Sequence, residues 1–223
     1  MQLRRLIIAL LVAIALAAAG WSWAAHWRPD PADYPLQGID LALDDPPPSW
    51  PHVRAAGADF AYIAATGGAQ RRNSRLGTLL AGAYSAGLRA GVVHVWSLCD
   101  PPAAQATNFL ATVPRLRDAL PAAVAVGYDD ACPTRPSPAR LVADLDAFLA
   151  AAEAHTGTPL LIRVSRAVEG DYALTAALDR PIWVIGNFRA PGYPARPWVM
   201  WRANAMRRIE GIDGPINWNV VKP

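Results

Sequence analysis

Carboxylate and other polar side chains at the ends of predicted strands are the groups in this sequence that could do chemistry. Asp40 lies in the first apolar strand, and Asp129 and Asp130 directly follow the fourth. Two carboxyl groups that face each other can divide the roles of general acid and general base. Further candidates at strand ends are His94, Trp96, Arg163, Asn187 and Trp201. We find no Gly-rich phosphate loop, no His cluster with metal-ligand spacing and no Ser/His/Asp arrangement, so we expect no metal and no cofactor.

Strands and helices are predicted to alternate along most of the chain, which would place these side chains at one end of a sheet. Short apolar runs predict strands over 38–43, 60–66, 90–96, 122–128, 160–165, 181–188, 198–202 and 216–221. Helices are predicted over 50–57, 74–87, 103–112 and 137–157. The last is the clearest, because Leu141, Leu145 and Phe148 recur at helical spacing behind a Ser137-Pro138 cap.

Five strand–helix units followed by bare strands predict the fold class α/β, with an irregular TIM-like barrel. We expect one barrel domain over 37–223, a Pro-rich linker over 26–36, and a membrane anchor or signal peptide over 1–25. In such barrels the functional residues lie at the carboxyl ends of the strands, which is where the candidates above are found.

The N-terminal segment has the pattern of an export signal. Arg4-Arg5 precedes an uninterrupted apolar run over 6–19 that continues weakly to Ala25. About 20 residues suffice to span a bilayer, and Trp21, Trp23 and Trp27 fall where an interfacial aromatic belt would lie. We favour an uncleaved anchor over a cleaved signal, and both place the remainder outside the cytoplasm.

Two cysteines, Cys99 and Cys132, each follow a predicted strand. An exported protein with two cysteines favours one disulfide between them. Two independent buried thiols are the alternative, and metal ligation by two cysteines without a nearby His cluster is disfavoured.

Motifs spread over 37–221 resemble the family-25 glycoside hydrolases, the Chalaropsis-type lysozymes. The motifs that carry the resemblance are Gly38-Ile-Asp40, Trp50, Phe60-Ala-Tyr-Ile-Ala-Ala-Thr-Gly67, Ala86-Gly-Leu-Arg-Ala-Gly-Val-Val-His94, Gln105-Ala-Thr-Asn-Phe-Leu-Ala-Thr-Val113, Arg180-Pro-Ile-Trp183, Trp198-Val-Met-Trp201 and Gly211-Ile-Asp-Gly-Pro-Ile-Asn-Trp-Asn219. The resemblance implies an irregular barrel and cleavage of peptidoglycan after N-acetylmuramic acid by clustered acidic residues.

The same resemblance identifies acidic positions that this chain has lost. The first family Asp is retained as Asp40, whereas the Asp-x-Glu strand aligns with Ala125 and Gly127, and the late Asp aligns with Asn217. Glycoside hydrolysis requires a proton donor and a second group at the oxocarbenium-like centre. The chain is thus identified as a divergent member, and the sequence leaves open whether it is an enzyme.

Several candidates keep two interpretations. Asp129 and Asp130 are either substitute carboxylates or an ordinary solvated turn, and His94 either faces the groove or is a satisfied core residue. Trp96 and Trp201 either stack on sugar rings or pack in the core. Arg163, with Arg202, binds substrate carboxylates or forms an ion pair. Asn187 and Asn217 complete the expected binding residues.

We expect a lysozyme-like protein of the bacterial cell envelope that acts on or binds peptidoglycan, with weak or no muramidase activity. An active glycosidase that uses Asp40 with Asp129 or Asp130, and a non-catalytic envelope interaction scaffold, are the alternatives. The expected partners are peptidoglycan or a related glycan, and the inner membrane through the N-terminal segment. A formal charge of only +3 gives no case for nucleic acid. We expect a monomer on the periplasmic side, anchored or secreted after cleavage.

Overall fold

A barrel forms the body of the protein in the computed structural model, which describes residues 2–115 and 118–223. Eight of the described strands close on themselves, because β1 pairs with β2 on one side and with β9 on the other. The barrel strands β1, β2, β4, β5, β6, β7 and β8 are joined by parallel pairings, while β9 is antiparallel to β8 and β1. The short β3 pairs antiparallel with β2 outside the barrel. The irregular α/β barrel predicted from the sequence is confirmed.

The elements follow the predicted order closely. The strands are β1 (Gln37–Leu41), β2 (Phe60–Gly67), β3 (Arg71–Arg72), β4 (Arg89–Trp96), β5 (Ala123–Val126), β6 (Leu161–Val164), β7 (Ile182–Ile185), β8 (Met200–Arg207) and β9 (Ile216–Val221). The helices are α1 (Gln2–His26), α2 (Trp50–Ala55), α3 (Leu76–Ser85), α4 (Pro102–Thr112), α5 (Pro138–Thr156), α6 (Arg166–Tyr172) and α7 (Leu174–Ala177).

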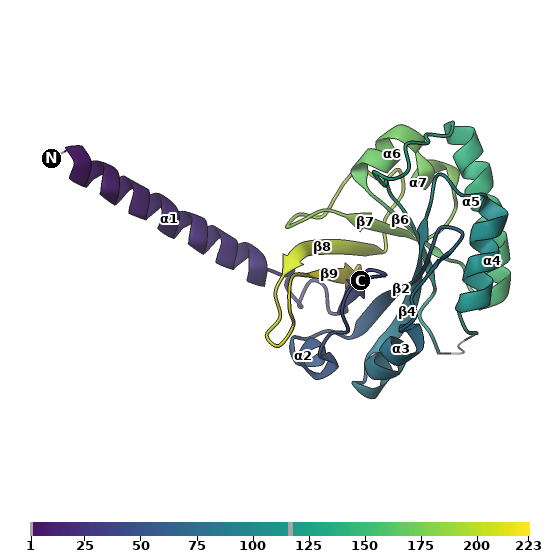
Figure 1. Cartoon of the computed structure of the whole chain (residues 1–223), viewed down its shortest axis with the longest axis horizontal. Coiled ribbons are helices and arrows are strands. Elements are labelled where there is room, and N and C mark those ends of the chain that lie inside the picture. Colours follow the sequence, from purple (N-terminus) through teal and green to yellow (C-terminus); the bar gives the residue numbers. More distant parts are fainter. Residues whose placement is uncertain (1, 116–117) are drawn as a thin grey trace.

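Alternation along the strands divides the apolar side chains between two cores. Parallel neighbours need crossovers, and α3 to α7 supply those between β2 and β7 on the outside of the barrel (Figure 1). The connection from β1 to β2 contains α2, and the one from β7 to β8 has no helix. The larger core lies between these helices and the strands and includes Phe109 and Phe148. The smaller core fills the barrel, where Tyr62 and Trp183 lie with ring centroids 5.0 Å apart beside the small Ala123.

Helix α5 has the predicted ends. The Ser137 side chain accepts a hydrogen bond from the amide of Arg140, and Gly157 ends the helix with a φ of 78°. That left-handed conformation favours glycine.

Two differences from the prediction have local causes. The short helices α6 and α7 were not predicted, because seven and four residues are too few to show a helical repeat. Strand β5 ends at Val126 and not at Tyr128, since the chain turns there into an isolated bridge between Asp129 and Cys132.

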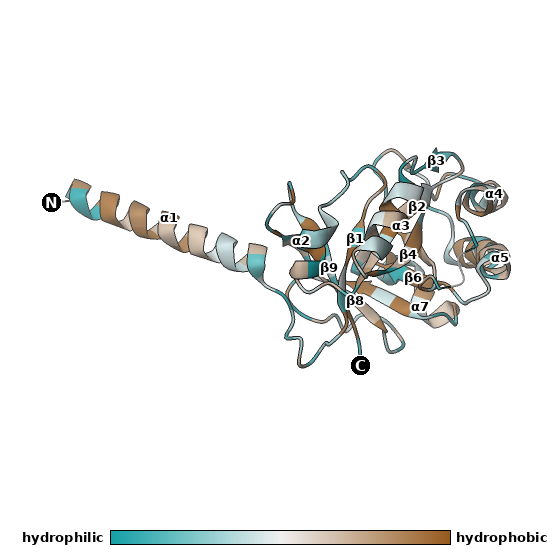
Figure 2. Cartoon of the chain, turned by 90° about the horizontal axis from the view of Figure 1, so that it is seen from below, coloured by the Kyte–Doolittle hydropathy of each residue, from teal (hydrophilic) through white to brown (hydrophobic). Residues whose placement is uncertain are grey.

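Helix α1 projects away from the barrel (Figure 1), and apolar residues cover most of its projecting part (Figure 2). It is long and apolar enough to cross a membrane by length and composition. The segment expected as a linker packs against the barrel: the Gln37 side chain donates hydrogen bonds to the carbonyls of Pro29 and Tyr34, and Arg28 donates one to Ala56.

The disulfide Cys99–Cys132 is present, as the cysteine count suggested. It joins the loop after β4 to the loop after β5, with a sequence separation of 33 residues. In the chain-entropy account, such a cross-link stabilises the protein mainly by restricting the unfolded chain.

We therefore predict that the double substitution Cys99→Ser with Cys132→Ser lowers the free energy of unfolding by about 3–4 kcal/mol. Urea unfolding of the oxidised parent and the variant measures this difference. Reduction of the parent should lower its stability by a similar amount. Equal stability of the oxidised parent and the variant would contradict the prediction.

Candidate functional site

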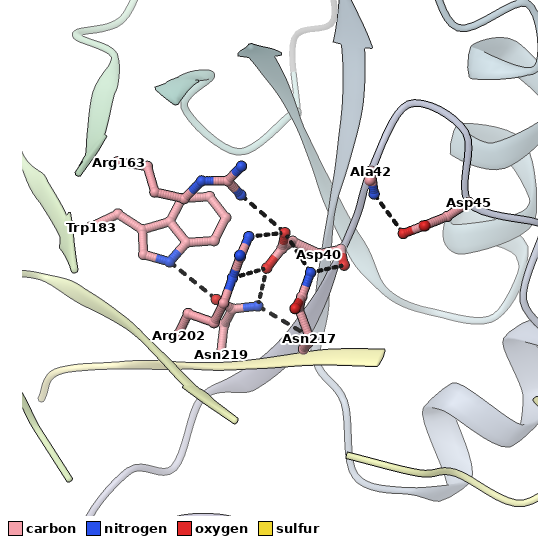
Figure 3. A network of polar contacts seen from close by, with 8 residues as sticks. All are labelled: Asp40, Ala42, Asp45, Arg163, Trp183, Arg202, Asn217 and Asn219. Atoms are coloured by element: carbon pink, nitrogen blue, oxygen red, sulfur yellow. Dashed lines mark hydrogen bonds and ion pairs between the residues drawn. The ribbon is translucent and has the colours of Figure 1, made fainter. Parts of the chain in front are cut away.

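Asp40 lies at the centre of the barrel, surrounded by donors from three other strands (Figure 3). Arg163 on β6 donates to its Oδ2 at 2.9 Å, and Arg202 on β8 donates to both of its carboxylate oxygens, with 3.0 Å from Nε to Oδ1. From β9, Asn219 donates to Oδ1 at 2.9 Å and Asn217 to Oδ2 at 3.3 Å. The Asp40 carboxylate therefore accepts five side-chain hydrogen bonds.

The electrostatics of this cluster keep Asp40 ionised. Burial alone would raise the pKa of Asp40, but the charges of Arg202 and Arg163, with hydrogen bonds from Asn219 and Arg202, hold it below its ordinary value. Burial and the charge of Arg202 lower the pKa of Arg163 to about 10, against the attraction of Asp40. One carboxylate thus faces two guanidinium groups, so that the cluster carries a net positive charge.

Aromatic and amide side chains orient the groups that form these ion pairs. The indole of Trp183 donates to the Asn219 side chain at 3.0 Å, which orients the amide toward Asp40. The Arg163 guanidinium lies over the Trp183 ring, 4.8 Å from its centroid. Asp40, Arg163 and Arg202 are mostly buried, with side chains 3 to 14% exposed.

Ala125 and Gly127, the two positions at which the family resemblance predicts carboxylates, are both small. Ala125 is buried inside the barrel and pairs in register with Arg163 on β6. Gly127 is exposed just beyond β5, and a Cβ added there would meet no atom within 4 Å. Neither position holds a group that can donate or accept a proton.

A groove of about 450 Å³ opens beside these positions, at the carboxyl ends of β2, β4 and β5. Its walls are formed by Gly67, Gly68, Gln70, Arg71, Val95, Trp96, Ser97, Cys99, Asp100, Gly127, Tyr128, Asp129, Ala131 and Cys132. Tyr128 is 37% exposed and is held by a hydrogen bond to Asp171 and by the Arg135 guanidinium 4.4 Å from its ring centroid. The disulfide forms part of the wall.

Asp129 and Asp130 lie on the exposed loop after β5, whereas Asp40 is buried inside the barrel. The Asp129 carboxylate accepts a hydrogen bond from the amide of Ala131 at 2.9 Å, as in a local Asx turn. Among the described residues, neither Asp129 nor Asp130 forms an ion pair. The structure does not bring them together with Asp40 as a carboxylate pair.

His94 is a core residue with satisfied hydrogen bonds and does not face the groove. It is fully buried on the outer face of β4, where it hydrogen-bonds Thr66 at 2.8 Å and Gln105 at 3.1 Å. Its ring stacks on Phe148 with a centroid distance of 4.7 Å. Burial lowers the pKa of His94 to about 4, against the opposing effects of Gln105 and Asp100, so the ring stays neutral at ordinary pH and does not reach the groove.

The other candidates, Trp96, Trp201 and Asn187, do not lie together at one site. Trp96 borders the groove but is 5% exposed and packs on Phe148. Trp201 lies on the outer face of β8, donates to the Gly186 carbonyl at 2.6 Å and packs on Trp27, so it is a packing residue and not a sugar platform. Asn187 is exposed after β7, where it accepts a hydrogen bond from the Ala205 amide.

Sequence reasoning missed Tyr128, Trp183 and Asn219 as site residues. An aromatic residue directly after a strand end was the available signal for Tyr128. For Asn219, only its two-residue spacing from Asn217, which places both side chains on one face of β9, could have served. Within the described residues, no group of three His, Cys, Asp or Glu side chains could hold a metal ion.

We predict that Asp40→Asn destabilises the protein by about 3–5 kcal/mol, because it leaves two buried guanidinium groups without a carboxylate. Since the folded pKa of Asp40 lies below the unfolded value near 3.8, its ionised form stabilises the fold above about pH 4. This contribution is lost as pH falls through the folded pKa.

Urea unfolding of parent and variant at neutral and acidic pH measures the effect, and the difference between them should shrink below about pH 4. Adding Arg202→Gln to Asp40→Asn should restore part of the stability, because one unpaired charge is removed. A single variant as stable as the parent at neutral pH would contradict this account.

Comparisons with known proteins agree with the fold and the motifs. The sequence profile of the glycosyl hydrolases family 25 matches residues 39–212. The chain is 28% identical over 200 residues to Lysozyme M1 of Streptomyces globisporus, covering 82% of this chain and 67% of that protein. A family 25 glycosyl hydrolase from Bacillus anthracis superposes with a TM-score of 0.77 at 23% identity, covering 88% of this chain and 92% of that one. The bacterial lysozyme from Streptomyces coelicolor superposes with a TM-score of 0.73 at 23% identity, covering 84% and 92%. This chain therefore belongs to the glycosyl hydrolases family 25.

Proposed function

We propose that this protein is a lysozyme-like component of the bacterial cell envelope that binds peptidoglycan, or a related glycan, and hydrolyses it slowly or not at all. Membership of the family supports a glycan ligand, as does similarity to a protein named a lysozyme. One observation carries the proposal: the single retained family carboxylate, Asp40, is fully engaged by Arg163, Arg202, Asn217 and Asn219.

The chemistry of glycoside cleavage is incompatible with that arrangement. The leaving oxygen needs a proton from a carboxylic acid, and a second carboxylate must assist at the anomeric centre. Asp40 stays ionised and cannot donate a proton, while Ala125 and Gly127 have no carboxyl group. Loss of a general acid alone costs about 10²–10⁴-fold in rate.

The alternative that pairs Asp40 with Asp129 or Asp130 is less well supported. Both loop carboxylates are exposed, whereas the Asp40 carboxylate is buried inside the barrel. Asp40 has no free acceptor site to offer a substrate.

The groove favours retained binding. A cavity of about 450 Å³ is large enough for a sugar residue. It combines the partly exposed ring of Tyr128 with the polar side chains of Gln70, Arg71 and Asp100 along its wall. An apolar ring face with polar groups around it is the usual setting for a carbohydrate.

The proposed location is the periplasmic side of the inner membrane, with α1 as an uncleaved anchor. Burial of Ala24 and Ala25 against the barrel supports retention of the helix, because cleavage after Ala25 would remove residues that pack on the folded protein.

We predict that the purified full chain sediments with peptidoglycan sacculi but releases muropeptides at least 100-fold more slowly than an active family-25 lysozyme, following from loss of the general acid. Sedimentation and chromatographic analysis of products on the same sample measure both quantities. Digestion at an ordinary lysozyme rate would refute the proposal. A protein that stays in the supernatant would instead identify an interaction scaffold.

We further predict that Tyr128→Ala weakens binding to sacculi by roughly fivefold, because it removes an aromatic contact worth about 1 kcal/mol. Tyr84→Ala is the matched control, since Tyr84 is similarly exposed, at 39%, on α3 outside the groove. Sedimentation at several protein concentrations measures the affinities. If both variants bind equally, the groove is not the glycan site.

A further inference from the structure

The last turn of α1 is built into the barrel. The final carbonyl groups of a helix have no partner within that helix, and here β8 and the residue after it supply the donors. Asn204 donates to the Ala24 carbonyl at 2.7 Å, Arg207 to His26 at 2.7 Å, and the amide of Arg208 to Ala25 at 2.7 Å. Asn204 is fully buried. The helix therefore leaves the barrel in a direction set by hydrogen bonds, without a flexible spacer.

An aromatic cluster lies beside the last turns of α1. The Trp23 ring contacts Trp27 and Phe188, with centroid distances of 6.2 and 5.2 Å. Phe188 belongs to the loop after β7 and has a left-handed backbone with φ of 66°, a conformation that a bulky residue adopts only under constraint. Trp21 and Trp23 remain 54% and 55% exposed, as aromatic residues in a membrane interface would be.

The length of α1 places this cluster at the bilayer surface. From Leu6 to Trp23 the helix extends about 27 Å, close to the hydrocarbon thickness of about 30 Å. Trp23 thus marks the end of the apolar span, and it is also the residue that contacts the barrel loop through Phe188. No length of chain separates the membrane interface from the barrel.

Arginines surround the same junction. Arg189 and Arg208 are exposed, and Arg207 lies over Trp218 at 4.4 Å with its Nε unpaired among the described residues. Within that part of the chain, none of the three forms an ion pair with a carboxylate, although Glu210 is nearby and exposed. The positive charges of Arg189 and Arg208 are available to an external anion, whereas Arg207 is buried and is held by the His26 carbonyl and the Trp218 ring.

We propose that an aromatic–basic collar, formed by Trp23, Trp27, Phe188, Arg189 and Arg208, seats the barrel directly on the bilayer that α1 spans, with its two arginines bound to anionic phospholipid headgroups. The inference rests on the anchoring part of the proposed function. Indole rings prefer the interface, and each arginine near an anionic surface adds attraction. The rigid junction holds both kinds of group at headgroup level.

The collar also fixes which end of the barrel approaches the membrane. Arg202 pairs in register with Ile185, the last residue of β7, and β8 continues beyond it to Arg207. The collar loops therefore project from the carboxyl ends of β7 and β8, the end of the barrel that carries the groove. A bound glycan would have to lie close to the membrane surface.

Hydrogen exchange of the full chain in lipid nanodiscs tests the proposal. We expect residues 186–192 and 205–213 to exchange more slowly in discs that contain phosphatidylglycerol than in discs of phosphatidylcholine alone. The double variant Arg189→Gln with Arg208→Gln should weaken docking by roughly 30-fold and remove most of this difference. Both side chains are exposed, so the variant should fold normally.

The matched control is Arg75→Gln with Arg140→Gln, which removes the same charge from two exposed positions outside the collar, the N-cap of α3 and the first turn of α5, and should exchange like the parent. Equal exchange in the two lipids, or a collar variant that behaves like the parent, would overturn the proposal. Recovery of peptides from residues 2–25 in the membrane fraction verifies the anchor. Binding to sacculi in detergent involves no bilayer, so failure of the collar and failure of glycan binding are distinguishable.

Discussion

The barrel centre depends on one carboxylate balanced between two guanidinium groups. Asp40 is the only acidic group that contacts Arg163 or Arg202 in the described part of the chain, and the three charges are stable in a buried site only together. Asn219, oriented by Trp183, and Asn217 complete the shell. The same contacts hold Asp40 in its ionised form and occupy both of its carboxylate oxygens.

The groove has a different character, and none of the residues of the Asp40 cluster lines it. Its walls come from the ends of β2, β4 and β5, and the Cys99–Cys132 disulfide ties two of the loops together. At Gly127 the wall carries no side chain, and a Cβ added there would meet no atom within 4 Å, whereas Tyr128 presents a partly exposed ring. In our proposal this groove serves glycan recognition more than bond cleavage.

The junction with α1 gives the barrel an orientation. Asn204, Arg207 and Arg208 bind the end of the helix through hydrogen bonds, so the direction of the helix relative to the strands is part of the fold. The residues that make this junction follow β7 or lie at the end of β8, on the side of the groove. Glycan recognition and membrane attachment therefore share one end of the barrel in our proposals.

The sequence alone determined the barrel, because the periods of strands and helices can be recognised within short segments and the family motifs occur in a fixed order along the chain. It also determined the two cysteines of the disulfide and the absence of carboxylates at positions 125 and 127, because these follow directly from residue identity. It did not determine what Asp40 contacts: Arg163, Arg202 and Asn219 lie 123 to 179 residues away, and only barrel closure brings them together. Nor did it decide the sides taken by His94 and Trp201. A shift of one residue moves a strand side chain to the opposite face, and strand ends cannot be placed that finely from sequence. Tertiary structure thus decided the chemistry of the site, since the charge state of a buried group is set by its neighbours in space.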